Sequence, residues 1–165
     1  MTRRADNAQP KRIPRALYTL LQIVWGLPQT IVGAVVFLAV LSCPHRIFHG
    51  AVVTTWRRKS SLSLGLFVFV TDDPLFHYPG RRTPEREKAM AEELAVHEYG
   101  HTIQSLFWGP LYLLAVGLPS LIWAWYPPYV RKRSKEHISY FAVWPENRAN
   151  ELGERHTGLR SPGKA

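Results

Sequence analysis

Two long runs of apolar residues dominate the pattern of this chain. Residues 17–41 and 106–126 contain no charged side chain, and each run is long enough to cross a bilayer as a helix. The first is interrupted by Gly-Leu-Pro at 26–28, and the second by Gly-Pro at 109–110 and Gly-Leu-Pro at 117–119. The first run is therefore either one kinked span or a hairpin that enters and leaves the membrane. The alternative is that both runs are buried helices of a soluble protein.

The stretch between the two runs predicts extended structure. Residues 51–56 and 62–70 are rich in valine, threonine and aromatic side chains, which favour strands. The polar sequence Arg-Arg-Lys-Ser-Ser at 57–61 separates them and is typical of a turn. Together these features predict a β-hairpin that precedes the next helix.

That helix is predicted to begin after Thr83, which is a favourable N-cap residue. A proline follows at the first helical position, and two glutamates lie in the first turn, where the helix dipole favours them. Further along, Met90, Leu94, His97 and His101 recur at spacings of four, three and four residues. They therefore share one helix face, and the two histidines point inward with apolar neighbours.

The sequence His-Glu-Tyr-Gly-His at 97–101 lies on this predicted helix. Two histidines four residues apart can bind one metal ion, and Glu98 between them can reach a water molecule at that ion. The chain has one cysteine, Cys43, so it has no internal disulfide and too little sulfur for a thiolate zinc cluster. We therefore expect a catalytic zinc site in which His97 and His101 are ligands and Glu98 is the general base.

A third zinc ligand is expected from a later helix, because catalytic zinc usually takes three protein ligands. A helix beginning near Pro145 places Glu146 and Asn150 on one face, so Glu146 can bind the metal while Asn150 orients a histidine ligand. Taken alone, Glu146 is also explained as a first-turn carboxylate that the helix dipole favours. His137 and Tyr140 are candidates for stabilising the transition state, and each is also explained as a structural or interfacial residue.

These residues resemble the glutamate-type zincins, and among them the integral-membrane zinc metallopeptidases of the HtpX and CAAX-prenyl-protease type. Residues 97–101 match the His-Glu-x-x-His helix of these families, and residues 146–150 are similar to their Glu-x-x-x-Asp helix. Asn150 replaces the usual aspartate, so it can accept a hydrogen bond from an imidazole but supplies no negative charge. The resemblance covers mainly residues 84–153. It implies the same three ligands and general base, and a strand at 62–70 that pairs with extended substrate.

The zinc interpretation also predicts the path of the second apolar run. If residues 106–126 crossed the bilayer once, His101 and Glu146 would lie on opposite sides, so we expect this run to turn back near residues 117–119. Basic residues number five before the first run, eight between the runs and eight after the second. No polar segment is depleted in them, as a translocated loop would be. We therefore expect an integral membrane protein with both runs embedded from one side and the active site facing the cytoplasm.

The sequence thus predicts an α+β fold, mainly α, with a membrane-embedded minimal zincin-like core and a β-hairpin before the active-site helix. A single domain at 16–153 is expected between a basic disordered tail at 1–15 and a disordered C-terminal tail at 154–165. The net charge of +9, without a recognition helix or an aromatic and basic strand pattern, favours a lipid bilayer over nucleic acid as partner.

The expected function is that of a membrane-embedded zinc metallopeptidase acting on a peptide or membrane-protein substrate, with Zn²⁺ as its cofactor. One alternative is a catalytically silent membrane interaction protein that keeps a structural metal site. Another is a zinc-dependent hydrolase of a non-peptide substrate, because the metal chemistry does not identify the bond that is cleaved. The sequence leaves the substrate and the oligomeric state open.

Overall fold

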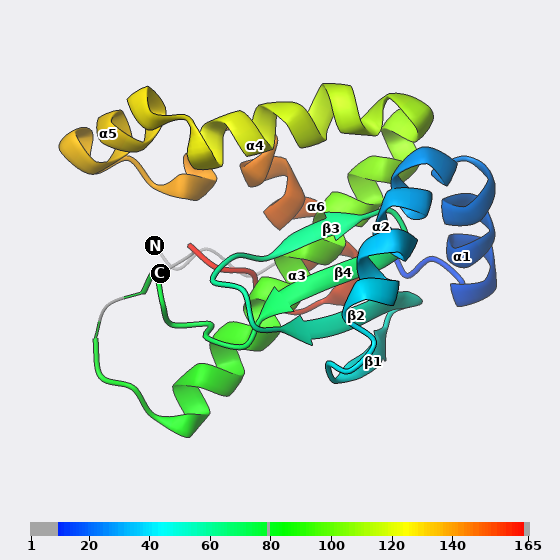
Figure 1. Cartoon of the computed structure of the whole chain (residues 1–165), viewed down its shortest axis with the longest axis horizontal. Coiled ribbons are helices and arrows are strands. Elements are labelled where there is room, and N and C mark those ends of the chain that lie inside the picture. Colours follow the sequence, from blue (N-terminus) through cyan, green and yellow to red (C-terminus); the bar gives the residue numbers. More distant parts are fainter. Residues whose placement is uncertain (1–9, 79, 164–165) are drawn as a thin grey trace, which may run out of the picture.

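The structure, a computed structural model, describes residues 10–78 and 80–163 and has an α+β fold (Figure 1). Helices predominate, as predicted, around one small mixed sheet. In chain order the elements are α1 (Arg15–Val24), α2 (Leu27–Ala39), β1 (His45–Phe48), β2 (Ala51–Trp56), β3 (Leu62–Leu64), β4 (Phe67–Thr71), α3 (Pro84–Trp108), η1 (Gly109–Leu111), η2 (Leu113–Gly117), α4 (Leu118–Trp125), α5 (Pro127–Glu136), η3 (Tyr140–Ala142) and α6 (Glu146–Thr157).

The sheet has the strand order β1-β2-β4-β3, so β3 lies at an edge. β1 and β2 are antiparallel, as are β3 and β4, but β2 and β4 run parallel, with Val53 opposite Val68. The predicted hairpin between residues 51–56 and 62–70 is therefore wrong. Gly65 has a positive φ of 61°, which suits glycine in a tight turn, and it divides the second stretch into two strands that form a hairpin of their own.

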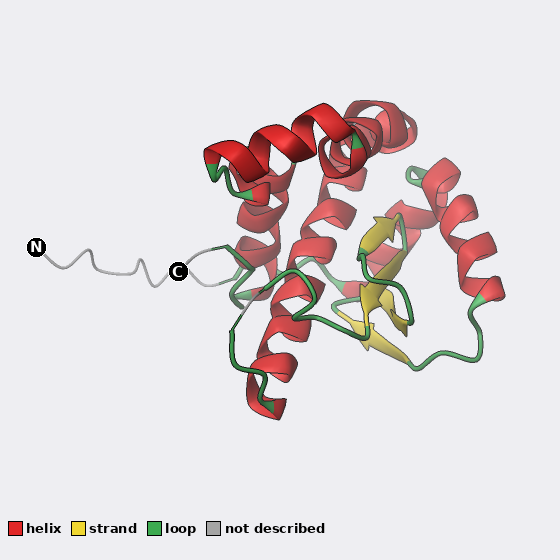
Figure 2. Ribbon diagram, turned by 60° about the vertical axis from the view of Figure 1, so that its left-hand side comes forward, coloured by secondary structure: helices red, strands yellow, loops and turns green. Residues whose placement is uncertain are grey.

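α3 packs along one side of the sheet and contributes the largest share of the buried core (Figure 2). It begins as predicted, because the Thr83 hydroxyl accepts a hydrogen bond from the Arg86 backbone N–H at 3.2 Å. Its inward face and the sheet bury the main apolar core, to which α1 and α6 each add a residue. The buried members are Tyr18, Phe48, Ala51, Val53, Val68, Val70, Leu94, Ala95, Val96, Tyr99, Ile103 and Leu152.

The second apolar run does turn back, but at a different place from the one predicted. α3 ends at Trp108, and Gly109, with a φ of 51°, starts a turn after which η2 and α4 run back above α3 and α6 (Figure 1). A Cβ at Gly109 would lie 2.3 Å from the Trp25 ring, so the turn is packed against the α1–α2 corner. At 117–119, where the turn was expected, the chain continues directly from η2 into α4, because a proline is tolerated in the first turn of a helix.

The first apolar run is divided between α1 and α2, which meet at a bend of 98°. Within the described residues, no single helix has the length and apolar composition needed to cross a membrane, although this bent pair has both when taken together. Membrane embedding therefore stays a prediction.

The described parts of the two predicted tails belong to the fold. Residues 1–9 and 164–165 lie outside the described part of the chain, but the Lys11 N–H donates to the Arg155 carbonyl at 3.0 Å, and α1 begins at Arg15. The predicted boundary at residue 153 falls inside α6, which continues to Thr157. The Ser161 N–H also donates to Glu154 Oε1 at 3.1 Å, so residues 154–163 belong to the domain, and the disordered tail expected at 154–165 is wrong for the residues that the structure describes.

Candidate metal centre

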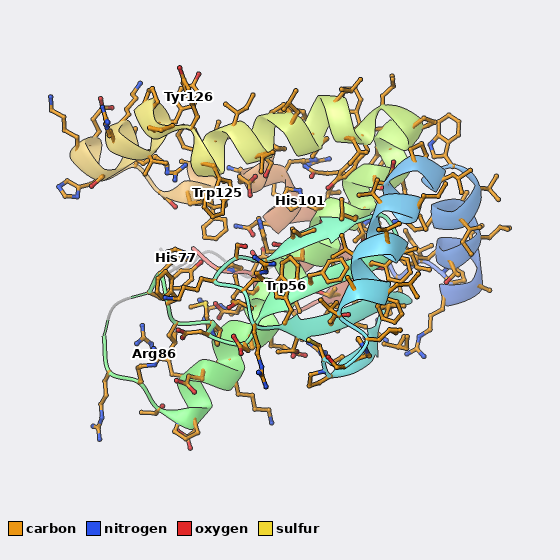
Figure 3. The ribbon with its side chains drawn as sticks, viewed as in Figure 1. Trp56, His77, Arg86, His101, Trp125 and Tyr126 are labelled. Carbon is orange, nitrogen blue, oxygen red and sulfur yellow. The ribbon has the colours of Figure 1, made fainter. Side chains whose placement is uncertain are left out.

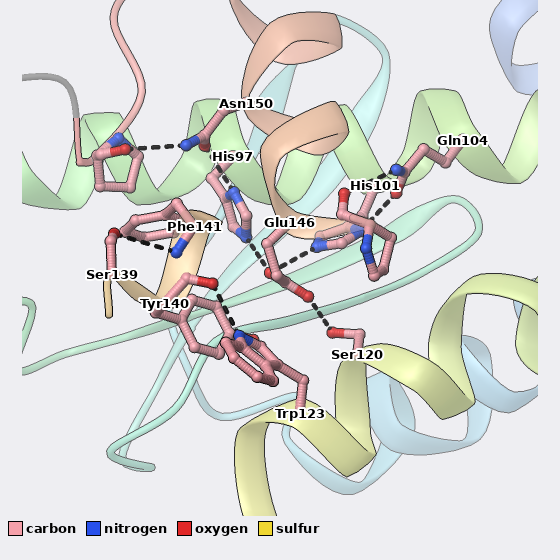
Figure 4. A network of polar contacts seen from close by, with 12 residues as sticks. His97, His101, Gln104, Ser120, Trp123, Ser139, Tyr140, Phe141, Glu146 and Asn150 are labelled. Carbon is pink, nitrogen blue, oxygen red and sulfur yellow. Dashed lines mark hydrogen bonds and ion pairs between the residues drawn. The ribbon is translucent and has the colours of Figure 1, made fainter. Parts of the chain in front are cut away.

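α3 and α6 bring His97, His101 and Glu146 together in the interior (Figure 4). The Nε2 atoms of His97 and His101 lie 3.1 and 3.4 Å from the same carboxylate oxygen, Oε2 of Glu146. All candidate ligand atoms lie within 4.8 Å of one another, and the three residues are buried. The structure therefore assembles the three side chains that were predicted from the sequence as metal ligands.

Asn150 fixes the orientation of His97. Its Oδ1 lies 2.7 Å from His97 Nδ1, and its Nδ2 donates to the Pro162 carbonyl at 2.9 Å. Because the amide NH₂ is committed to a carbonyl, the amide oxygen faces the imidazole and accepts a hydrogen bond from Nδ1–H. The Nε2 atom of His97 then carries a lone pair, and this lone pair points towards Glu146.

Gln104 holds His101 in the same way. His101 Nδ1 lies 2.7 Å from Gln104 Oε1, while Gln104 Nε2 donates to the Pro145 carbonyl at 2.9 Å. The Nε2 lone pair of His101 is therefore also directed at Glu146. The sequence argument did not assign this role to Gln104. The sequence feature that points to this role is the position of Gln104 three residues after His101, which places both side chains on the same side of the helix.

The three assembled groups require a cation between them. Two nitrogen lone pairs and a carboxylate oxygen that face one another repel unless a proton or a metal ion lies among them. Burial raises the pKa of Glu146, but when a proton lies on Nε2 of His101 or His97, the positive charge and the N–H donor outweigh burial and hold that pKa well below its usual range. The group could hold a metal ion. The spacings of 3.1 and 3.4 Å are close to the ~3.4 Å expected between ligands ~2.1 Å from a tetrahedral ion.

Glu98, on the same helix, is also buried. Burial raises its pKa to about 7, an effect that His97 and Ser63 reduce and Glu146 increases. Its Oε2 has no hydrogen-bond partner and is one of only four such buried side-chain atoms among the described residues. A buried carboxylate oxygen without a partner, within the electrostatic reach of His97 and Glu146, is suited to accept a proton from a molecule bound there.

α4 covers the site and is attached to it from above. The Ser120 hydroxyl donates to Glu146 Oε1, and Trp123 Nε1 donates to the Tyr140 carbonyl at 2.8 Å (Figure 4). Arg133 donates to the Trp123 carbonyl, and its guanidinium lies 4.9 Å from the centre of the Trp123 ring. Ser120 belongs to no recognisable sequence motif. Its contact with Glu146 arises only because the chain reverses at Gly109 and brings α4 back over the site.

The two residues proposed to stabilise a transition state have different positions. Tyr140 lies in η3 beside Glu146, where burial, and then the Glu146 charge, raise the pKa of its phenol well above the usual range. His137 is exposed at the C-cap of α5. η3 also places the Phe141 ring edge-on against His97, with the ring centres 5.1 Å apart. The structure thus brings Tyr140 to the site and leaves His137 on the surface.

The site is closed in this conformation, because His97, Glu98, His101 and Glu146 are each at most 5% exposed. A solute can reach them only if a covering element moves, and side-chain hydrogen bonds attach α4 to Glu146 and to the Tyr140 carbonyl.

Comparison of the chain with models of known protein families, with curated proteins and with solved structures finds no match.

Proposed function

We propose that this protein is a zinc-dependent peptidase. His97, His101 and Glu146 are the metal ligands, and Glu98 is the general base. One observation carries the proposal: two buried imidazoles, each oriented by an amide, direct their Nε2 atoms at one carboxylate oxygen. Glu98, on the same helix as the histidines, adds a buried carboxylate oxygen without a partner, within the electrostatic reach of His97 and Glu146.

The donor set supports zinc as the metal. Two imidazole nitrogens and one carboxylate oxygen, without a thiolate, are typical of catalytic zinc sites, in which a fourth position stays open. A zinc ion held there supplies a Lewis acid for a carbonyl group and lowers the pKa of a water molecule. Asn150 and Gln104 keep both rings in the tautomer that such a site requires.

The surrounding side chains support hydrolysis. Glu98 takes the proton of the attacking water through its unpartnered Oε2 and delivers it to the leaving amine. Ser120 holds Oε1 of Glu146 and so leaves Oε2 directed at the two histidines. The Tyr140 phenol, close to Glu146, is a donor for the developing oxyanion.

The edge strand β3 supports a peptide as the substrate. β3 ends the sheet, and Ser63 at its centre is near enough to Glu98 to influence the pKa of that carboxyl. An edge strand presents unpaired backbone N–H and carbonyl groups, which an extended peptide can pair with. A peptide bound there passes close to Glu98.

A second candidate is a catalytically silent protein with a structural metal site. It is favoured by the nearly complete burial of the three ligands and of Glu98, which is typical of a closed structural site. The two functions differ in the role of Glu98, because a structural site has no use for a general base.

The test combines zinc content with cleavage of a quenched-fluorescent peptide library. We expect one zinc ion per chain in the wild type and in Glu98→Gln, and a loss of hydrolysis by about 10²-fold or more in Glu98→Gln. His97→Ala should lose the zinc, whereas His77→Ala, at an exposed histidine in the loop after β4, should retain it. Zinc retained in His97→Ala would refute the site. Bound zinc with no hydrolysis by the wild type would favour the silent protein.

A further inference from the structure

η2 and α4 expose an apolar face on the side of the helix away from the metal site. Leu114 and Leu121 are 68% and 56% exposed, which is unusual for side chains of this size in regular structure. The spacing of the exposed residues places them on one stripe of the helix. The stripe consists of Leu114, Leu118, Leu121 and Ile122.

The opposite face of the same segment explains why this stripe points outward. Val116 is fully buried, Ser120 donates to Glu146, and Trp123 donates to the Tyr140 carbonyl. These contacts fix the rotation of α4 about its axis. The same contacts therefore turn the apolar side chains of the stripe towards the solvent. A continuous apolar stripe on a surface helix marks an interaction surface.

α5 adds positive charge directly after this stripe. Arg131, Lys132 and Lys135 are exposed. Arg133 instead turns back to the Trp123 and Ala124 carbonyls at the C-terminal end of α4, which fixes α5 relative to α4. Tyr126 points outward at the junction of the two helices (Figure 3). An apolar stripe, an aromatic residue at its end and a basic cluster follow one another along the same edge of the molecule.

We propose that the outer face of η2 and α4, with the exposed basic side chains of α5, docks on a lipid bilayer surface that carries anionic headgroups. The apolar stripe enters the boundary between headgroups and acyl chains, Tyr126 lies at headgroup depth, and the lysine and arginine side chains contact the lipid phosphates.

Charge distinguishes a lipid surface from a second copy of this chain as the occupant. A symmetric dimer formed through this face would bring together two chains that each carry a net charge of +9, and their like charges would repel. An anionic bilayer is instead attracted by the same charges while it accepts the apolar stripe. Because Ser120 on the inner face of α4 contacts Glu146, docking would also hold the candidate metal site beside the membrane.

The depth of the stripe can be measured with an environment-sensitive NBD label. The purified full-length chain carries Cys43→Ser and one new cysteine, either Leu121→Cys on the stripe or Lys88→Cys as the matched control. Lys88 is exposed in the early turns of α3, away from α4 (Figure 1). With vesicles of three parts phosphatidylcholine to one part phosphatidylglycerol, we expect the Leu121→Cys label to brighten by about twofold or more and the control label to stay unchanged.

The contribution of charge is tested with Lys132→Glu/Lys135→Glu, which should weaken the vesicle response of the Leu121→Cys label by about tenfold or more in lipid concentration. Three results would overturn the proposal. The label could remain in water while the protein associates with vesicles through another surface, it could brighten with protein concentration without lipid, or it could respond equally after the charge reversal. Glu98→Gln should bind vesicles like the wild type, so failure of docking and failure of hydrolysis are separate outcomes.

Discussion

Gly100 of α3 lies directly against the backbone of Ala149 in α6. A Cβ at Gly100 would be only 1.8 Å from the Ala149 carbonyl oxygen, and a Cβ at Gly153 would be 2.2 Å from the Val96 carbonyl oxygen. The two helices therefore cross with their backbones in contact. This close crossing brings the first turn of α6, which carries Glu146, to the part of α3 that carries the two histidines.

Gly100→Ala should accordingly disrupt the site without altering any ligand. The added methyl group meets backbone atoms that cannot move aside, so the helices must separate. We expect a loss of about 1–3 kcal/mol in the free energy of unfolding, measured by urea denaturation, and a loss of zinc binding. Gly117→Ala is the matched control, because its Cβ would meet nothing closer than 3.7 Å. It should be neutral or slightly stabilising, and equal effects of the two variants would contradict the crossing.

Asn150→Asp, which introduces the residue usual in the resembling families, should destabilise this protein. Asn150 Nδ2 donates to the Pro162 carbonyl, and an aspartate would place a carboxylate oxygen against that carbonyl oxygen. We expect a loss of about 1–3 kcal/mol in unfolding free energy. Asn150→Ala should weaken zinc binding by about 10–100-fold in a chelator competition assay. Asn147→Asp, at an exposed position of the same helix, controls for the added charge and should change neither quantity by much.

α4 should open more readily when its attachments to the site are removed. Ser120→Ala and Trp123→Phe together delete the hydrogen bonds to Glu146 and to the Tyr140 carbonyl while keeping an aromatic ring at position 123. Since each such bond contributes roughly 1 kcal/mol or more, amide hydrogen exchange in α4 should accelerate by about tenfold or more. Exchange in the middle of α3 should not change. Leu121→Ala on the outer face is the control, and matching acceleration in that variant would show that the attachments do not hold α4.

The burial of Glu98 should make the metal-free protein less stable as pH rises. Its pKa is raised by burial from 4.5 to about 7, so between these values the folded state binds a proton that the unfolded state has lost. Stability from this group is therefore present below about pH 4.5 and lost as pH rises through 7. In EDTA, Glu98→Gln should be more stable than the wild type by roughly 3 kcal/mol at pH 8 and by less than ~1 kcal/mol at pH 5.

Urea denaturation at the two pH values measures this difference. Glu136→Gln, at an exposed position at the end of α5, should follow the wild type at both. If Glu98→Gln is no more stable than the wild type at pH 8, the charge of the buried Glu98 carboxylate is already balanced by neighbouring groups in the metal-free protein.

The sequence predictions that follow from local geometry alone lie within one helix, whereas Glu146 and Asn150 were expected at the site because catalytic zinc usually takes three protein ligands with oriented histidines. Thr83 and the residues after it specify the start of α3, and the spacing of His97 and His101 places both on one face. The strand pairing was wrong because the partner of β2 depends on contacts distant in sequence. The β3–β4 hairpin was missed because Gly65 was its main local turn signal in a mostly apolar stretch. The second apolar run has breaks at 109–110 and at 117–119, and the packing of Trp25 against Gly109, which places the turn at the first of them, has no local signal.

The sequence by itself determined which donor groups this protein has and how those on one helix are arranged, because the period of an α-helix relates spacing to direction. Only the tertiary structure decided that Glu146 meets both histidines, that Gln104 and Asn150 orient their rings, and that Ser120 on the returning helix contacts the same carboxylate. The physical reason is that these contacts depend on how closely α3 and α6 cross and on where the chain reverses, and both are set by packing between segments far apart in the sequence.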